Sequence, residues 1–405
     1  MATAYRTLFQ APGSKAFTLA GLLARLPLPM TGIGIITLLS QAYGSYALAG
    51  MVAATFVLTY ALLSPQLSRL VDLKGQRRVL PLATVISASG LLILAASTYW
   101  GAPLGCLFIG ALLAGCMPSL SAMVRARWTA LYRGQPLLQT AHSLETVFDE
   151  VTFILGPPLA VGLSVGVLPQ AALLAAALLL ALGVLALLTQ RSTEPAVLAR
   201  QGSAANPGSV IRLPGVRRLT LLTMSMGVIV GTLDMVSVAF AEQLDRPAAA
   251  SAVLSAYALG SCVAGLLFGV LQPGAAQPRQ LWVASLATAA STLPLMAVAS
   301  IPGLTAAVLV AGLCFAPTLI IAMTLVERLV PEQQLTEGMT WLLAGLNIGV
   351  ALGAALAGQL VDHAGPRGGF ALALAAGMVV LLVGLTASRS LHSHGLTSPL
   401  QGAES

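Results

Sequence analysis

Apolar segments of membrane-spanning length recur along almost the whole chain, and they constrain its fold more than any other feature. A helix needs about 20 apolar residues to cross the hydrocarbon core of a bilayer. A window of that length identifies twelve segments, at approximately residues 17–41, 46–68, 79–99, 103–124, 138–166, 169–189, 218–240, 248–271, 280–300, 304–327, 337–361 and 369–388. Because a backbone inside lipid must satisfy its own hydrogen bonds, we expect every segment to be helical and the fold to be all-α.

The composition supports a polytopic membrane protein and excludes a soluble domain. The chain has 405 residues, of which 57% are hydrophobic and only 8% are charged. A soluble domain has about 45–50% apolar and about 25% charged residues. The four cysteines lie inside apolar segments without CxxC spacing, so we expect buried side chains, no disulfide framework and no metal site. We also expect no cofactor.

The basic residues indicate how the segments are oriented. If the N-terminus is assigned to the cytoplasm, 17 of the 20 lysines and arginines fall on the cytoplasmic side. Because short cytoplasmic loops carry an excess of such residues, the pattern predicts a multi-pass protein of the plasma (inner) membrane with both termini cytoplasmic. The net charge of +7 then faces an anionic leaflet and requires no nucleic acid as a partner.

A long polar segment near mid-chain divides the segments into two sets of six. It runs from about Gln190 to Val216 and is rich in Gly, Pro, Ser and Arg, which is typical of a flexible linker. We therefore predict two pseudo-symmetric six-helix bundles. The predicted parts are an N-terminal bundle (1–189), a cytoplasmic linker (190–217), a C-terminal bundle (218–390) and a flexible cytoplasmic tail (391–405).

The two halves also resemble each other in sequence. The tripeptide Pro-Ser-Leu at 118–120 and the tripeptide Pro-Thr-Leu at 317–319 each precede a charged helix end. Their offset is about half the chain, which favours an internal duplication. We predict a cytoplasmic charge network at these two helix ends, formed by Arg125, Arg127, Glu327 and Arg328.

A short charged run, SRLVDLKGQRR from Ser68 to Arg78, joins the second and third segments. Asp72 follows a helix, where its carboxylate can reach basic partners or the N-terminus of a neighbouring helix. Gly75 permits a tight turn. Arg77 and Arg78 are expected at the level of the lipid headgroups.

Two six-helix halves, a basic central linker and this run together resemble the major facilitator superfamily. The family's loop between its second and third helices reads roughly G-x-L-x-D-R-x-G-R-R. It is matched by Leu70, Asp72, Gly75, Arg77 and Arg78, whereas Ser68, Leu73 and Gln76 depart from it. The resemblance implies that Asp72 belongs to a gating loop and helps to hold the two halves together in the outward-facing state. The alternative is an ordinary basic turn that only sets orientation.

A second resemblance lies in the fifth segment. Gly156 and Pro157 stand where efflux members of the family carry a glycine-rich motif, roughly G-x-x-x-G-P-x-x-G-G. Thr152, Ala160 and Val161 replace its other glycines. Pro157 and Pro158 remove two backbone donors and should bend the helix. This bend serves either as a pivot between the halves or as a fixed kink.

Ionisable side chains inside the predicted segments are candidates for a proton or substrate pathway, because each costs about 2.5–3.5 kcal/mol near the bilayer centre. They are Arg25, Glu145, Asp149, Glu150 and Asp234. Arg25 lies at a depth similar to that of residues 149 and 150, so we expect it to pair with one of these two carboxylates. The other could carry a proton; alternatively, the pair is static and locks two helices together.

The remaining two acids have different expected roles. Glu145 is shallower, and we expect it to meet Arg125 or Arg127 in a structural or gating network. Asp234 lies nearer the outer face, and the resemblance implies that its helix lines the central cavity. We therefore expect Asp234 to contact a cation or a proton; the alternative is a solvated acid near the outer mouth.

These features favour a transporter over an enzyme. The chain has no phosphate-binding GxxxxGK[ST] loop and no visible nucleophile–base set. The resemblance implies a secondary transporter that works by alternating access, with the lipid bilayer, a small-molecule substrate and protons as partners, and a monomeric state. The embedded carboxylates and Gly156-Pro157 favour proton-coupled efflux of an amphipathic compound. Alternatives are an uptake or exchange carrier for a metabolite, and a non-transporting sensor or lipid-handling protein.

Overall fold

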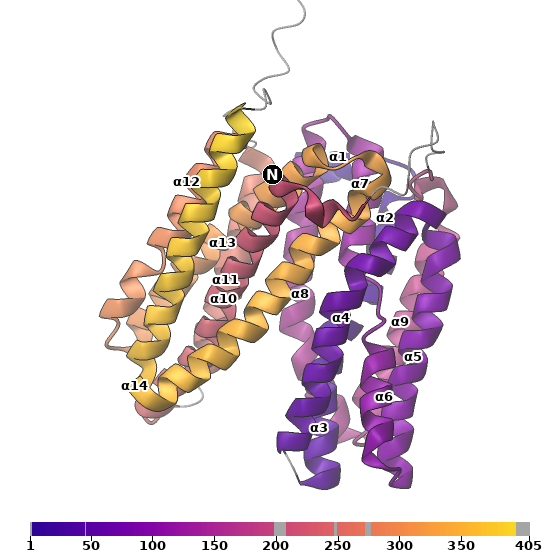
Figure 1. Cartoon of the computed structure of the whole chain (residues 1–405), viewed down its shortest axis with the longest axis vertical. Coiled ribbons are helices and arrows are strands. Elements are labelled where there is room, and N and C mark those ends of the chain that lie inside the picture. The colour runs from indigo at the N-terminus through magenta and orange to yellow at the C-terminus, as the bar shows by residue number, and fades with distance from the viewer. Residues whose placement is uncertain (1, 45, 198–207, 247–248, 272–276, 394–405) are drawn as a thin grey trace, which may run out of the picture. The chain divides into compact units, whose positions relative to one another are not determined.

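Every element of regular structure is helical in the residues that this computed structural model describes, which are 2–44, 46–197, 208–246, 249–271 and 277–393 (Figure 1). The first half contains α1 (Ala2–Leu8), α2 (Ser14–Arg25), α3 (Pro27–Tyr43), α4 (Tyr46–Lys74), α5 (Gln76–Trp100), α6 (Leu104–Ala114), α7 (Leu120–Tyr132), α8 (Leu137–Gly166) and α9 (Ala171–Thr189). The linker contains the short helices η1 (Arg191–Thr193) and η2 (Val210–Arg212). The second half contains α10 (Pro214–Gln243), α11 (Ala249–Leu271), α12 (Gln277–Ala290), η3 (Leu293–Ala297), α13 (Ile301–Leu329), η4 (Glu332–Gln334) and α14 (Leu335–Ser393). The predicted all-α fold is confirmed.

Ten helical stretches in the described part of the chain are long and apolar enough to cross a membrane, and they correspond to ten of the twelve predicted segments. The other two segments are interrupted. In the fourth, α6 ends at Ala114 and α7 begins at Leu120, with Pro118 between them. In the ninth, the short helix η3, which contains Pro294, follows α12. Each proline lacks a backbone donor, so each of these two segments is built from two shorter helices.

Contacts divide the chain into two compact units. One comprises Met1–Ala141, Phe148–Ser209 and Glu332–Thr340, and the other comprises His142–Val147, Val210–Pro331 and Trp341–Ser405. The predicted boundaries of the two bundles and the linker stay a prediction. The predicted tail, residues 391–405, lies mostly outside the described residues.

Small residues bring the helices of the first unit together. Helix α5 packs against α6 and α9, and α9 also packs against α2 (Figure 1). A Cβ added at Gly90 of α5 would lie 2.2 Å from the backbone nitrogen of Ala114, and one at Gly183 of α9 would lie 2.5 Å from the Cα of Ala24. Lipid provides no hydrophobic force between helices, so close packing at small residues supplies much of their attraction. The contact at Gly183 positions the end of α2, where Arg25 lies.

The second unit is packed in the same way around α13, which contacts α10, α11 and α12. The long helix α14 consists of two helices that meet at Gly365, whose φ of 67° lies in the left-handed region. The first part packs against α10, where a Cβ at Gly231 would lie 2.0 Å from the carbonyl oxygen of Val350. The second part packs against α12, where a Cβ at Gly384 would lie 2.2 Å from the Ser285 hydroxyl.

Candidate functional site

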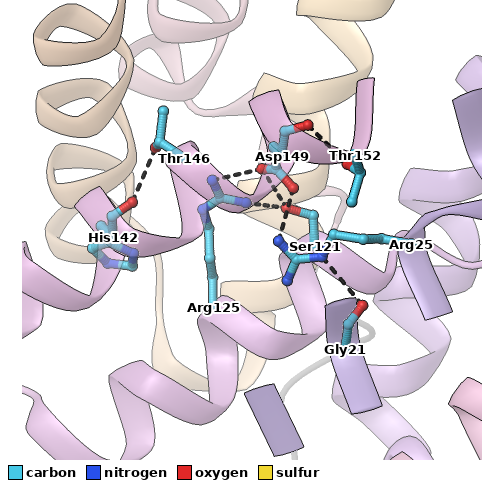
Figure 2. Close-up of polar contacts among 8 residues, drawn as sticks. All are labelled: Gly21, Arg25, Ser121, Arg125, His142, Thr146, Asp149 and Thr152. Carbon is cyan, nitrogen blue, oxygen red and sulfur yellow. Dashed lines mark hydrogen bonds and ion pairs between the residues drawn. The ribbon is translucent and has the colours of Figure 1, made fainter. Parts of the chain in front are cut away.

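Two arginines and a serine converge on the carboxylate of Asp149 in α8 (Figure 2). The Arg25 Nη1 atom lies 2.9 Å from Oδ1 of Asp149, and the Arg125 Nη2 atom lies 2.8 Å from Oδ2. The Ser121 hydroxyl donates a hydrogen bond to the same Oδ2 at 2.8 Å, and accepts one from Arg125. We call Arg25, Ser121, Arg125 and Asp149 the charge cluster. It lies within the first unit and joins α2, α7 and α8.

The local geometry of α2 and α7 directs the side chains of Arg25, Ser121 and Arg125 toward Asp149. Ser121 and Arg125 are four residues apart on α7, so they share one face of that helix. Helices α2 and α7 approach closely at Gly21, where an added Cβ would lie 2.4 Å from Cγ2 of Val124. Arg25 is the last residue of α2, and its Nε atom donates to the carbonyl of Gly21 at 3.2 Å. Gly21 therefore both permits the helix contact and orients the arginine.

The charge cluster is nearly shielded from solvent. The exposed fraction of the side chain is 0% for Arg125, 5% for Arg25 and 20% for Asp149. Taking charges out of water costs several kcal/mol for each ion, and good hydrogen-bonding geometry must offset this cost. The three contacts to one carboxylate supply this geometry. Among the three charged side chains of the cluster, that of Asp149 is the most exposed.

The predicted pairing of Arg25 with Asp149 or Glu150 is confirmed for Asp149. The sequence groups Arg125 with Arg127 in a cytoplasmic network, whereas the structure brings Arg125 to Asp149. Ser121 was missed entirely. The only sequence signal for Ser121 is its spacing of four residues from Arg125, which is common for serines in helices.

The other embedded acids lie outside these four residues. Glu150, the next residue of α8, is half-buried, and Glu145 is fully buried on the same helix. Asp234 is exposed on α10, in the second unit. The expected meeting of Glu145 with Arg125 or Arg127 stays a prediction, as does the expected role of Asp234.

Gly156 and Pro157 lie inside α8, which runs without interruption from Leu137 to Gly166. Gly156 is buried against α3, where an added Cβ would lie 2.7 Å from Cγ of Pro29. Since the ring of Pro29 cannot rotate away, only glycine fits at position 156 without a shift of one helix. The role of this position as a pivot stays a prediction.

The run from Ser68 to Arg78 forms the end of α4 and the start of α5, and Asp72 caps a third helix. Its Oδ1 atom accepts a hydrogen bond from the backbone nitrogen of Thr336 at 3.2 Å, and its Oδ2 atom accepts one from that of Glu337 at 2.8 Å. These are unsatisfied donors in the first turn of α14, where a carboxylate also meets the positive end of the helix dipole. Asp72 thus occupies the position of an N-cap supplied by a distant part of the chain.

Further contacts surround this cap. The hydroxyls of Ser68 and Thr340 lie 2.7 Å apart, and Arg69 Nε lies 3.9 Å from Oε2 of Glu337. The Ser209 hydroxyl donates to the Glu337 carboxylate. Residues 68–72 of α4 therefore hold residues 335–340 at several points, all within the first unit.

The turn after Asp72 depends on Gly75, which precedes α5 and has a φ of 85°. Few residues other than glycine adopt this conformation. Arg77 and Arg78 are exposed, and the backbone nitrogen of Arg77 donates to Oε1 of Glu194 at 3.0 Å. Glu194, which sequence reasoning missed, thus ties the linker to the start of α5.

Arg127 is fully buried behind this turn. It donates to Oε1 of Gln76 at 2.8 Å, to the carbonyl of Gln190 at 2.8 Å and to the Thr193 hydroxyl at 2.9 Å. Burial lowers the pKa of the Arg127 guanidinium to about 10, against an opposing effect of nearby Glu194, so Arg127 stays charged at neutral pH. The departure from the family pattern at Gln76 gives Arg127 a neutral partner.

The other two members of the predicted cytoplasmic network lie near the end of α13. Glu327 is 7% exposed, whereas its neighbour Arg328 is exposed. Within the described ranges of the chain, no three His, Cys, Asp or Glu side chains gather in a way that could hold a metal ion.

Membrane-length helices with a buried charge cluster are features of secondary transporters, and comparison with known proteins agrees. The sequence model of the Major Facilitator Superfamily matches residues 17–271 and 219–402, so the chain belongs to this family. An uncharacterized MFS-type transporter of Sinorhizobium fredii, y4rN, is 26% identical over 376 residues, which are 89% of this chain and 91% of that protein.

Solved structures of transporters share the fold across 93% of this chain. The human organic anion transporter MFSD10 is 18% identical, with a TM-score of 0.69 over 100% of its length. A bacterial homologue of the iron transporter ferroportin, in an outward-facing state, is 15% identical, with a TM-score of 0.71 over 99%. The Escherichia coli fucose:proton symporter FucP is 15% identical, with a TM-score of 0.70 over 98%. These TM-scores show that the chain shares the fold of these proteins, and the substrate is left to be inferred from the residues of this chain.

Proposed function

We propose that this chain is a proton-coupled exporter of a small amphipathic compound, monomeric in the plasma (inner) membrane, with both termini in the cytoplasm. The observation that carries the proposal is the charge cluster, in which the carboxylate of Asp149, whose side chain is 20% exposed, contacts two buried arginines. Ionisable groups inside a membrane protein are costly, and they commonly mark proton and substrate pathways.

The cluster supports proton coupling through the contacts that Asp149 makes. A proton on its carboxylate would weaken the contacts to Arg25 and Arg125, which lie on different helices, α2 and α7. Protonation would thereby change how α2 and α7 are held against α8. Glu150 and Asp234 are the further carboxylates through which a proton could pass.

Export rather than uptake is supported by position 156. The close contact with Pro29 requires a glycine there, next to a proline, as in the glycine-rich motif of efflux members of the family. A helix that pivots at this point would carry Asp149 with it, since both residues belong to α8.

Transport by the purified full-length chain in proteoliposomes tests the proposal. We expect a pH gradient to drive small amphipathic compounds against their concentration gradient, and addition of such a compound to move protons in the opposite direction. Asp149→Asn should reduce this coupled flux by at least about tenfold, a loss of roughly 1.4 kcal/mol of coupling or more. The coupled flux of Glu150→Gln and of Asp234→Asn shows whether each of these two carboxylates also carries the proton.

Asp245→Asn is the matched control, because it removes a carboxylate from an exposed turn of the same protein. If Asp149→Asn and Glu150→Gln both transport as the wild type does, the cluster is a static lock and proton coupling through it is excluded. Downhill exchange without proton movement would indicate a metabolite carrier, and no flux of any tested compound would favour a sensor.

We also propose that Asp72 acts as a gate by capping α14 in one state of the cycle and releasing it in the other. Asp72→Ala removes both hydrogen bonds to residues 336 and 337, whereas Asp72→Asn keeps an acceptor. Loss of an N-cap costs about 0.5–2 kcal/mol, so amide hydrogen exchange at 335–340 should be faster in the alanine variant by about twofold to thirtyfold. Unchanged exchange there would leave the loop as a basic turn that only sets orientation.

A further inference from the structure

A cleft of about 640 Å³ lies on the first unit, between the turn after α4 and the segment that follows α9. Lys74, Arg77 and Arg78 line one side and Arg191 lines the other. Glu194 is the one acidic side chain among the lining residues. No part of the transport proposal uses this cleft.

The basic side chains of the cleft are available to a ligand. Lys74, Arg77, Arg78 and Arg191 are all exposed. Within the part of the chain that the structure describes, none of the four side chains forms an ion pair or a hydrogen bond. Four cations and one carboxylate give the lining a formal charge of +3. Cations gathered in this way repel one another unless an anion lies between them.

The backbone holds these cations around one space. Gly75, with its φ of 85°, turns the chain so that Lys74 ends α4 and Arg77 lies in the first turn of α5. The backbone nitrogen of Arg77 is bound by Glu194, which fixes the linker segment opposite. A basic loop that only sets membrane orientation needs its charges on the correct side and does not need them around a cleft.

The rest of the lining is apolar. Leu73, Pro195 and Val197 contribute to the wall, and the Val197 side chain is 50% exposed. The cleft lies where one membrane-length helix ends, at Lys74, and the next begins, at Gln76, so we expect it at the level of the lipid headgroups. Arginine and lysine are the side chains that recognise phosphate, and arginine does so through two parallel hydrogen bonds.

We propose that this cleft binds a phosphate-bearing anion, and that the phosphate of an anionic phospholipid in the adjacent leaflet is the source that fits its mixed lining. The phosphate lies among the four basic side chains, and the start of the lipid tails lies against Leu73 and Val197. Because Asp72 is three residues before Gly75 on the same turn, the bound lipid stabilises the segment that caps α14.

The test uses the purified full-length protein in detergent. It is titrated with phosphatidylglycerol, with phosphatidylcholine, and with inorganic phosphate against chloride at equal ionic strength. Binding is followed by native mass spectrometry and by thermal unfolding. We expect phosphatidylglycerol to bind and to raise the melting temperature, and phosphatidylcholine to do neither.

Variants test whether the lipid binds to the cleft itself or only to the positive charge of the protein surface as a whole. The triple change Arg77→Gln, Arg78→Gln and Arg191→Gln should weaken phosphatidylglycerol binding by at least about tenfold. Arg212→Gln, Arg217→Gln and Arg279→Gln together remove the same charge from exposed positions outside the cleft, and should change the affinity less than about twofold. Glu194→Gln keeps an acceptor for the backbone of Arg77 and removes the acid, so it should tighten binding about fivefold.

Each outcome decides the proposal. Binding of phosphatidylglycerol with the stated responses of the three variants supports it. Binding of inorganic phosphate but not of phosphatidylglycerol, with the same responses, supports the phosphate site and assigns it to a soluble compound. Equal losses in the two triple variants, or no loss in the first, overturn it. If the first triple variant folds poorly, Glu194→Gln still tests the proposal, because it should increase the affinity for phosphatidylglycerol, and an unchanged or lower affinity would contradict the proposal.

Discussion

Asp149 joins three helices of the first unit through contacts of its charged carboxylate. Its carboxylate contacts Arg25, Ser121 and Arg125 from two other helices. Breaking a buried ion pair by removing one partner costs about 3–5 kcal/mol, because it leaves a charge without compensation. The same contacts that would couple a proton to helix movement therefore also contribute to the stability of the first unit.

Asp149→Asn should lower the free energy of unfolding by about 3 kcal/mol, because it removes the charge that both guanidinium groups contact. Arg25→Met should destabilise by a similar amount. The double variant should cost less than the sum of the two, with an interaction energy of about 1–3 kcal/mol in a double-mutant cycle. Thermal unfolding in detergent measures all four forms. Strictly additive effects would show that the 2.9 Å contact carries no energy of its own.

Gly75 is the second residue whose identity has a direct physical cause. Its φ of 85° and ψ of 153° belong to a region that is essentially restricted to glycine. Gly75→Ala should cost about 1–3 kcal/mol, since such strain has this magnitude. Gly50→Ala is the control, because Gly50 lies in α4 and an added Cβ there meets nothing within 4 Å. Unfolding measurements should show a lower free energy of unfolding for Gly75→Ala and an unchanged one for Gly50→Ala.

At the scale of elements, prolines and glycines decide where helices break and where they touch. Pro118 separates α6 from α7, so α7 begins at Leu120 and extends to Tyr132, eight residues beyond the predicted end of the fourth segment. This extension brings Arg125 inside a helix and into the charge cluster. Helix α8, by contrast, stays continuous from Leu137 to Gly166, although Pro157 and Pro158 lie inside it.

The contact between α8 and α3 provides a test at this scale. Gly156→Ala would place a Cβ 2.7 Å from the ring of Pro29, so the two helices must separate. Overpacking of this kind costs about 1–3 kcal/mol, and transport should fall with it. Gly162→Ala is the matched control on the same helix, where an added Cβ meets nothing within 4 Å. Equal behaviour of the two variants in unfolding and transport assays would argue against a tight contact at Gly156.

At the scale of the whole molecule, the fold is that of the Major Facilitator Superfamily, and the described residues form ten long spans and two that are built from shorter pieces. Each compact unit contains residues from both halves of the sequence. The short stretch Glu332–Thr340 belongs to the first unit, where Asp72 caps its helix. A gate that depends on this capping would link the two halves of the sequence through nine residues.

Orientation is a property of the whole molecule and is open to a direct test. The basic residues predict that the turn at residues 73–78 faces the cytoplasm and the turn at Gly101 faces the opposite side. Alkaline phosphatase fused after Gly101 should therefore be active in cells, whereas a fusion after Gly75 should be inactive. A fluorescent protein fused to the C-terminus should be bright. The reverse pattern in both phosphatase fusions would invert the predicted topology.

Much of the fold could be predicted from the sequence, because lipid imposes one simple condition on it. Apolar runs of membrane length must become helices, so the number of spans followed from hydropathy. The depth and charge of Arg25 also predicted that it pairs with Asp149 or Glu150. Similar depth and opposite charge narrowed the partner to these two neighbouring carboxylates, and the structure identifies Asp149.

The amino-acid sequence alone determined the membrane class, the helical content, the family resemblance and the embedded charges, because these depend on composition and local spacing. Only the tertiary structure decided which partners those charges have. Arg125 and Arg127 are two residues apart, so they point to different sides of α7, and packing sends one to Asp149 and the other to Gln76. In the same way, Asp72 caps a helix 264 residues away, and Glu194 closes the basic cleft beside Arg77. Such contacts depend on how helices pack in three dimensions, which no local pattern of residues encodes.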